Sequence, residues 1–278
     1  MASVDRLPGV APARRAGRSS WIGWVGRIGL VAKGISFALV GVLAVALAAG
    51  VGGRATGREG ALEVVADESY GRAIILGLAA GFAAYAIWRL AQAVFDRAGE
   101  GADGSGILKR LGYLARALVY GALTATALTL LDGTGNGSTE TAQARQSTAE
   151  ALSWPGGRWL VGAVGAGFLG AAAFNAYRAF TQKFEERWYC DDLSESARRV
   201  LVGVSSVGLM ARFVIFSFIG LFVLKAAYEY DPQEAIGLDG ALRKLADGAF
   251  GGALLGALAA GLLCYALFCF VEARYRRV

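Results

Sequence analysis

Apolar positions gather into six long runs, and short stretches rich in charged residues and glycine separate them. Each run has the roughly 20 residues that a helix needs to cross a hydrocarbon core about 30 Å thick. None alternates apolar and polar residues as a membrane strand does. The pattern predicts an all-α membrane protein with six transmembrane helices, at residues 28–49, 72–94, 109–131, 157–180, 207–227 and 250–271.

A short motif at the start of the first, third and fifth apolar runs shows that the chain is built from repeats. Its three copies are Gly29-Leu-Val-Ala-Lys33, Gly112-Tyr-Leu-Ala-Arg116 and Gly208-Leu-Met-Ala-Arg212. Because every repeat crosses the membrane twice, all three keep one orientation. The sequence therefore predicts an N-terminal cytoplasmic segment and three tandem two-helix hairpins, at residues 1–27, 28–95, 107–181 and 204–278.

Three such hairpins are most simply arranged as a closed ring around a pseudo-threefold axis, with an asymmetric row of hairpins as the alternative. The second helix of each hairpin carries small residues four positions apart, which allow close approach of helix backbones in lipid. We predict helix contacts there, and a channel-lining role is the less favoured reading. The three pairs are Gly77 with Gly81, Ala163 with Gly167, and Ala257 with Gly261.

The loop inside each hairpin also carries a pattern. Glu59-Gly-Ala-Leu62 and Asp239-Gly-Ala-Leu242 each begin with an acidic residue and continue with helical spacing of apolar residues. Both predict a short amphipathic helix at the outer membrane surface, with the acid in its first turn. The middle copy has instead a stretch rich in Gly, Ser and Thr at residues 132–141, which we expect to be mobile.

Charge sets the expected orientation. On the side of the two termini we count 15 basic residues, against 7 on the opposite side. The positive-inside rule then places both termini in the cytoplasm. Arginine beside anionic lipid accounts for the net charge of +6.

Outside the spans, no basic stretch is interleaved with stacking aromatics, so we expect no nucleic-acid partner. We also expect no cleaved signal peptide.

The three repeated basic residues are the feature with chemical content. Lys33, Arg116 and Arg212 lie inside apolar helices, where a charge is costly unless it snorkels or finds a partner. The repeat alignment brings three further residues to the same level and pairs Lys33 with Gln92 and Arg212 with Glu272. It also sets Arg116 beside Arg178, two like charges that call for an anion such as a lipid phosphate. Snorkelling with lipid or helix contacts is favoured over a ligand site on the axis.

The chain has no histidine and three cysteines, none of them in a CxxC spacing. A histidine-ligated haem or zinc is therefore excluded, and we expect no cofactor and no metal. The nearest enzyme candidate is Cys190-Asp191-Asp192, a thiol with two carboxylates but no suitable base beside it. A solvated linker is the better reading, and the sequence favours a protein that is not an enzyme.

These motifs together resemble a known family. The chain is similar to the bacterial membrane proteins grouped as domain of unknown function 1206, which are built from three two-helix repeats. The resemblance implies this fold and a location in the bacterial cytoplasmic membrane, and it brings no activity or catalytic residue. The resemblance rests on five sequence segments: Gly29-Leu-Val-Ala-Lys33-Gly34, Tyr85-Ala-Ile-Trp-Arg89, Gly156-Gly-Arg-Trp-Leu160, Asp239-Gly-Ala-Leu242 and Glu272-Ala-Arg-Tyr-Arg-Arg277.

Two functions follow as hypotheses. The first is an accessory or assembly subunit that binds another membrane complex or organises lipid around it. Interface aromatics such as Trp24 and Trp188 are available for a partner, although most such residues only anchor helices. The alternative is a small transporter or channel for an anionic solute, with the three basic residues converging on the axis. The sequence leaves the oligomeric state open.

Overall fold

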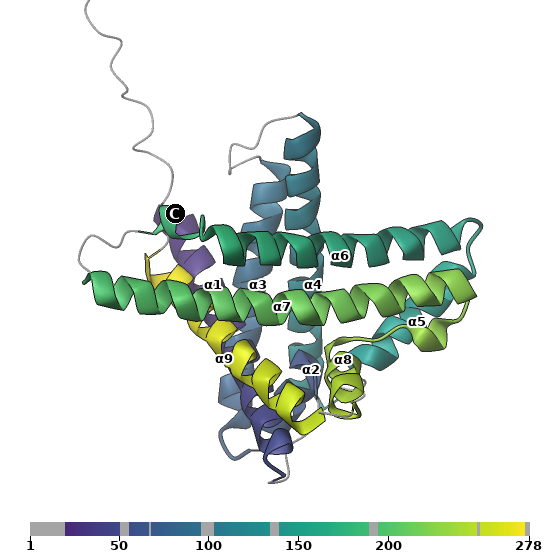
Figure 1. Ribbon diagram of the computed structural model, residues 1–278, viewed down its shortest axis with the longest axis horizontal. Helices are drawn as coiled ribbons and strands as arrows, with labels where there is room; N and C mark the ends of the chain where they lie inside the picture. The colour runs from purple at the N-terminus through teal and green to yellow at the C-terminus, as the bar shows by residue number, and fades with distance from the viewer. Residues whose placement is uncertain are drawn as a thin grey trace, which may run out of the picture.

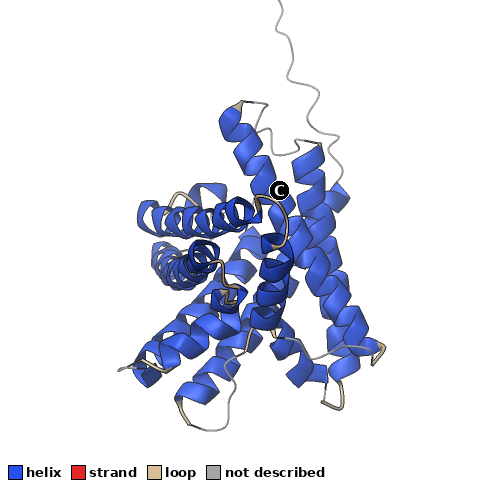
Figure 2. Cartoon of the chain, turned by 90° about the vertical axis from the view of Figure 1, so that its right-hand side faces the viewer, coloured by secondary structure: helices blue, strands red, loops and turns tan. Residues whose placement is uncertain are grey.

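The computed structural model describes residues 20–50, 56–66, 68–95, 103–133, 139–188, 194–248 and 251–275. Figure 2 shows that these residues form helices joined by loops. Six of the helices are long and apolar enough to cross a membrane, which confirms the predicted fold class. They are α1 (Ser20–Ala48), α3 (Gly71–Val94), α4 (Gly104–Leu131), α6 (Gly157–Thr181), α7 (Glu195–Glu229) and α9 (Gly251–Tyr275).

Three shorter helices, α2 (Arg58–Ala66), α5 (Glu140–Leu152) and α8 (Leu238–Ala246), lie between the two long helices of each repeat. We call their end of the bundle the loop-helix end and the opposite end the linker end. Two single-turn helices, η1 (Glu185–Arg187) and η2 (Pro232–Glu234), complete the described elements. Of the stretch 132–141, which we expect to be mobile, residues 134–138 lie outside the described residues, and the last two residues belong to α5, which begins at Glu140 with Thr139 as its N-cap.

The long helices pack mainly between repeats. The three most extensive interfaces join α3 to α4, α6 to α7, and α9 to α1, so that each repeat contacts the next in a cycle. Figure 1 shows α6 and α7 side by side, running across the direction of α3 and α4. At 35 residues, α7 is about 50 Å long, which exceeds the thickness of a hydrocarbon core of about 30 Å.

Packing within a repeat occurs in the first and third copies. α1 contacts α3 and α7 contacts α9, whereas α4 and α6 share no extensive interface. Only 22% of the residues in the most apolar stretch of α4 or of α6 are buried, against 39–56% in the other long helices. The three repeats therefore contact one another in a closed cycle, but the ring of six long helices has a gap within the second repeat, where α4 and α6 expose broad apolar faces.

Glycines show this difference at atomic scale. A Cβ added to Gly29 would lie 2.5 Å from Tyr85 Cβ, and one added to Gly208 would lie 2.5 Å from the Tyr265 nitrogen. At Gly112, the third member of this set, the nearest atom is Arg116 Nη1 at 3.4 Å. The repeated motif thus forms a tight helix crossing in two copies and faces open space in the third.

The predicted small-residue pairs follow the same rule. A Cβ on Gly81 would lie 2.3 Å from Ala32 Cβ, and one on Gly261 would lie 2.4 Å from Ala211 Cβ. No atom lies within 4 Å of a Cβ added to Gly77 or Gly167. Ala163 and Ala257 occupy the positions that precede Gly167 and Gly261 by one turn. Close backbone contact is therefore confined, within these pairs, to the first and third repeats.

Candidate functional site

Each first helix presents a cation and an aromatic ring on one face. Lys33, Arg116 and Arg212 are followed one turn later by Phe37, Tyr120 and Phe216. The second helices add Tyr85 from α3 and Tyr265 from α9, the two tyrosines that cover Gly29 and Gly208. Repeat symmetry therefore builds a layer of cations beside a layer of rings, which we call the cationic–aromatic cluster.

Lys33 lies at the centre of this cluster. Its side chain is buried, at 8% exposure, and its Nζ atom lies 5.1 Å from the ring centre of Tyr265 and 5.6 Å from that of Tyr85. Both distances are within cation–π range, and a desolvated pair of this kind contributes about 2 kcal/mol. Two repeat-related tyrosines thus hold one ammonium group between α3 and α9.

Two arginines flank Lys33. Arg89 is 7% exposed, and it donates from Nη2 to Tyr85 Oη and from Nη1 to Gln92 Oε1, both at 2.8 Å. Arg212 donates from Nη1 to Tyr265 Oη. The Nε–H group of each arginine is buried and has no hydrogen-bond acceptor. Each therefore retains a donor that is costly to leave unpaired.

Arg89 is a member that sequence reasoning missed. It lies at the end of Tyr85-Ala-Ile-Trp-Arg89, one of the segments that carry the family resemblance. Its equivalents in the other repeats are Asn175 and Cys269, so repetition does not mark it as basic. The signal that identifies it is an arginine one turn after a buried tyrosine inside an apolar helix.

Arg116 differs from the other repeated cations because it is exposed. Its Nη1 atom donates to Gly112 O at 3.0 Å, on its own helix. Its electrostatic neighbours include Arg89 and Arg212, which carry the same charge, and Tyr85. Arg116 therefore lies at the border between the cluster and the open face of α4.

The remaining predicted residues have partners that the repeat alignment did not anticipate. Gln92 accepts from Arg89, and Glu272 Oε1 pairs with Arg178 Nη2 at 3.3 Å. This ion pair joins α6 to α9, so Arg178 faces a carboxylate in place of the like charge that the alignment suggested. Glu272 is buried within reach of Arg89 as well. This carboxylate therefore serves Arg178 as an ion-pair partner and Arg89 as an electrostatic neighbour.

The loop-helix end is closed by contacts between helix N-termini. Glu140 at the start of α5 accepts from the Arg58 backbone nitrogen of α2 at 2.8 Å and from that of Leu238 in α8 at 3.3 Å. Asp239 Oδ1 accepts from the backbone nitrogen and hydroxyl of Thr141 at 2.9 and 2.8 Å. Carboxylates thus satisfy the first-turn donors of three helices that meet at one junction.

Arg58 connects this junction to the cluster. Its guanidinium carbon lies 5.6 Å from the ring centre of Phe37 and 5.7 Å from that of Tyr120, while Glu140 lies 3.5 Å from its Nε atom. The guanidinium carbon of Arg212 also lies 5.6 Å from the Phe37 ring. Phe37 therefore contacts one cation from the loop-helix end and one from the cluster.

Glu59, beside this junction, makes stability depend on pH. Burial, reinforced by the Glu140 carboxylate, raises the pKa of Glu59 from 4.5 to about 7. The folded state then holds this proton more tightly than the unfolded chain, so the contribution is complete below pH 4.5 and is lost as the pH rises through 7. We expect Glu59→Gln to be more stable than the parent at pH 8, by on the order of 2 kcal/mol.

Thermal unfolding in detergent between pH 5 and pH 8.5 measures this effect. Glu68→Gln, which removes an exposed carboxylate just beyond the end of α2, is the matched control and should keep the slope of the parent protein. An unchanged slope in Glu59→Gln contradicts the assignment.

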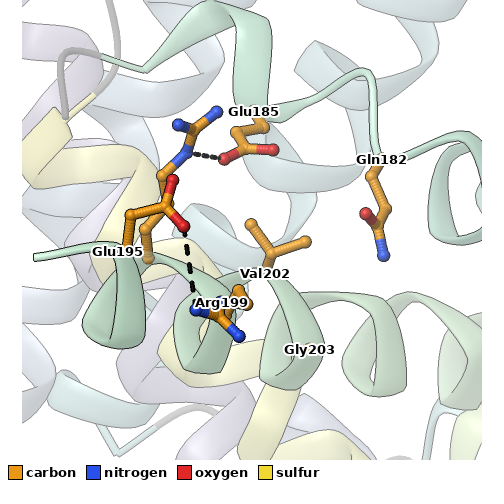
Figure 3. A pocket seen from close by; sticks show the side chains of 7 residues that line it. Gln182, Glu185, Glu195, Arg199, Val202 and Gly203 are labelled. Atoms are coloured by element: carbon orange, nitrogen blue, oxygen red, sulfur yellow. Dashed lines mark hydrogen bonds and ion pairs between the residues drawn. The ribbon is translucent and has the colours of Figure 1, made fainter.

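A polar hollow of about 310 Å³ lies at the linker end (Figure 3). It is lined by Gln182, Glu185 and the start of α7, and its charges pair with one another, Arg198 with Glu185 and Arg199 with Glu195. Exposed ion pairs of this kind contribute little to stability.

Two further features singled out in the sequence belong to the linker between the second and third repeats. Trp188, expected at the membrane surface, is buried against Phe184 and Phe268. The enzyme candidate Cys190-Asp191-Asp192 lies outside the described residues.

Comparison with known proteins gives these repeats a family. The model of the family described as Domain of Unknown Function (DUF1206) matches three times, at residues 28–96, 111–182 and 207–276. The chain belongs to the DUF1206 family. Each match contains one of the cations Lys33, Arg116 and Arg212. The chain is also 33% identical over 258 residues to "Uncharacterized protein YxxB" of Bacillus subtilis (strain 168), covering 93% of this chain and 92% of that protein. No solved structure matches.

Proposed function

We propose that this DUF1206 protein is a non-enzymatic integral membrane protein that binds an anionic ligand in its cationic–aromatic cluster. The observation that carries the proposal is the pair of buried Nε–H groups on Arg89 and Arg212, neither of which has a hydrogen-bond acceptor. Both arginines are electrostatic neighbours of the buried cation Lys33. A phosphate or carboxylate oxygen supplies the missing acceptor and offsets the excess of positive charge. Tyr85 and Tyr265 hold these cations in place before a ligand arrives.

The proposed biological role is that of an accessory or lipid-organising subunit of a larger membrane complex. It is supported by the exposed apolar faces of α4 and α6, against which lipid or another membrane protein would pack. We place the protein in the bacterial cytoplasmic membrane with both termini in the cytoplasm, because the basic residues gather at the linker end. The relative from Bacillus subtilis agrees with a bacterial setting.

Transport of an anionic solute is the second candidate, and the contacts of Phe37 favour it. Arg58 and Arg212 both reach this ring, so cations follow one another from the loop-helix end to the cluster. A solute anion would pass from one guanidinium to the next once Phe37 and the Glu140 contact moved aside. The two candidates share the same binding site and differ in whether its ligand crosses the membrane.

Ligand-dependent stabilisation tests the binding site. The purified protein in uncharged detergent is heated with inorganic phosphate or with phosphatidylglycerol. We expect at least one probe to stabilise the parent protein, by about 2.7 kcal/mol when the ligand is at 100 times its Kd. Arg89→Gln and Arg212→Gln should lose this effect, because each removes an unpaired donor. Arg199→Gln, which removes an exposed arginine at the linker end, is the matched control.

Failure of both probes to stabilise the parent protein overturns the proposal. Native mass spectrometry of the same preparation separates the two roles when it is combined with a flux assay. A stoichiometric membrane-protein partner supports the accessory role. Passage of the stabilising anion into sealed vesicles, abolished by Arg212→Gln, supports transport.

A further inference from the structure

The exposed face of α4 has the features of a lipid-binding surface. Lys109, Gly112 and Arg116 lie three, four and seven positions apart, so a helix places them on one face. Lys109 and Arg116 are exposed, and the exposed apolar side chains that lie nearest to them around the helix are Leu108 and Val119. Two cations thus stand in a surface that otherwise suits acyl chains.

Gly112 leaves room for a ligand between the two cations. Its repeat equivalents Gly29 and Gly208 are covered by Tyr85 and Tyr265, whereas its own nearest neighbour is the side chain of Arg116. The second repeat has Ala171 at the position of these tyrosines, and α6 is packed on α7 and away from α4. The contact that closes the site in two repeats is therefore missing in the third.

The direction of Arg116 indicates the membrane level of the ligand. Its guanidinium turns back one helical turn to the carbonyl of Gly112, toward the linker end, where Lys109 lies. A cation in a lipid-facing helix that bends toward the nearer interface meets the headgroup layer. The linker end is also the more basic end, which suits a leaflet rich in anionic lipid.

We propose that the face of α4 formed by Lys109, Gly112 and Arg116 binds the phosphate of an anionic phospholipid. The lipid reaches the bundle sideways, through the place where α4 and α6 do not pack. Its phosphate lies on Arg116, at the border of the cluster that contains Arg89 and Arg212. The inference deepens the proposed function and rests on it, since it names the class of ligand that reaches the cluster.

Native mass spectrometry after exchange into mixed micelles of phosphatidylglycerol and phosphatidylcholine tests the site. We expect the parent protein to retain phosphatidylglycerol in preference to phosphatidylcholine. Arg116→Gln should lower this retention about fivefold, as expected for one lost contact with lipid phosphate. Gly112→Phe fills the bare position and should block retention, while Gly121→Phe places the same side chain in open space on another face of α4 and should not.

Four results would overturn the inference. The first is equal retention of the two lipids, and the second is unchanged retention in Gly112→Phe. The third is loss of retained phosphatidylglycerol in the presence of millimolar inorganic phosphate, which would identify a soluble anion as the ligand. Stabilisation by inorganic phosphate through Arg89, without any retained lipid, would overturn the lipid site and leave the proposed function intact.

Discussion

Gly208→Ala is expected to destabilise the protein by about 3 kcal/mol or more, while Gly112→Ala leaves its stability unchanged or increases it. The two positions are equivalent in the repeated motif, and alanine is the better helix former at both by about 1 kcal/mol. At Gly208 the new methyl group would lie 2.5 Å from the Tyr265 nitrogen, so α7 and α9 must separate. At Gly112 it meets only the end of the Arg116 side chain.

Unfolding curves in detergent, measured for both variants and for Gly29→Ala, distinguish tertiary contact from helix propensity. Gly29→Ala should resemble Gly208→Ala, because its methyl group would meet Tyr85 at the same distance. Similar stability of all three variants would contradict the open second repeat. The comparison therefore tests the central feature of the fold with changes of a single carbon atom.

Asp239→Ala should lower the free energy of unfolding by about 2–4 kcal/mol, the second large effect that we expect. Asp239 is buried, and the change leaves the Thr141 backbone nitrogen without its acceptor. It also frees the Thr141 hydroxyl, which accepts from Gly237 and Gly240 at 3.0 and 3.1 Å. The N-termini of α5 and α8 would then lose two of the hydrogen bonds that join them, and both helices should exchange amide hydrogens faster.

Hydrogen exchange and thermal unfolding measure this result. Asp247→Ala is the matched control, since Asp247 lies exposed at the end of the same helix. Asp239→Asn should fall between the two, because its side-chain oxygen still accepts a hydrogen bond but carries no charge. Unaltered exchange in α5 of Asp239→Ala would show that the junction does not depend on this carboxylate.

The loop helices show which parts of the fold the local sequence pattern predicts. Acid and apolar spacing identified α2 and α8 from Glu59 and Asp239, and both helices lie where they were expected. The sequence pattern did not predict α5, because the glycine-rich segment before it obscures the helix start at Thr139 and Glu140. The meeting of the three N-termini joins Thr141 to Asp239, 98 residues away, and pattern does not encode such a contact.

The candidate site was likewise predicted in part from the sequence. The repeated motif identified Lys33, Arg116 and Arg212 as related cations, since repetition is visible without any fold. It did not find Arg89, whose counterparts are Asn175 and Cys269, and it gave Glu272 no link to Arg178. Partners depend on which helices touch, and here the strongest contacts form between repeats.

The sequence by itself determined the six apolar helices, their grouping into three repeats and the register of one cation per repeat. These features follow from helix periodicity and from the length needed to cross a bilayer, which are local properties. Only the tertiary structure decided that α4 and α6 separate, that Lys33 lies between two tyrosines while Arg116 is exposed, and that the loop helices share one junction. The related copies of one motif pack against different neighbours, and in lipid the close packing of those neighbours decides which side chains are buried.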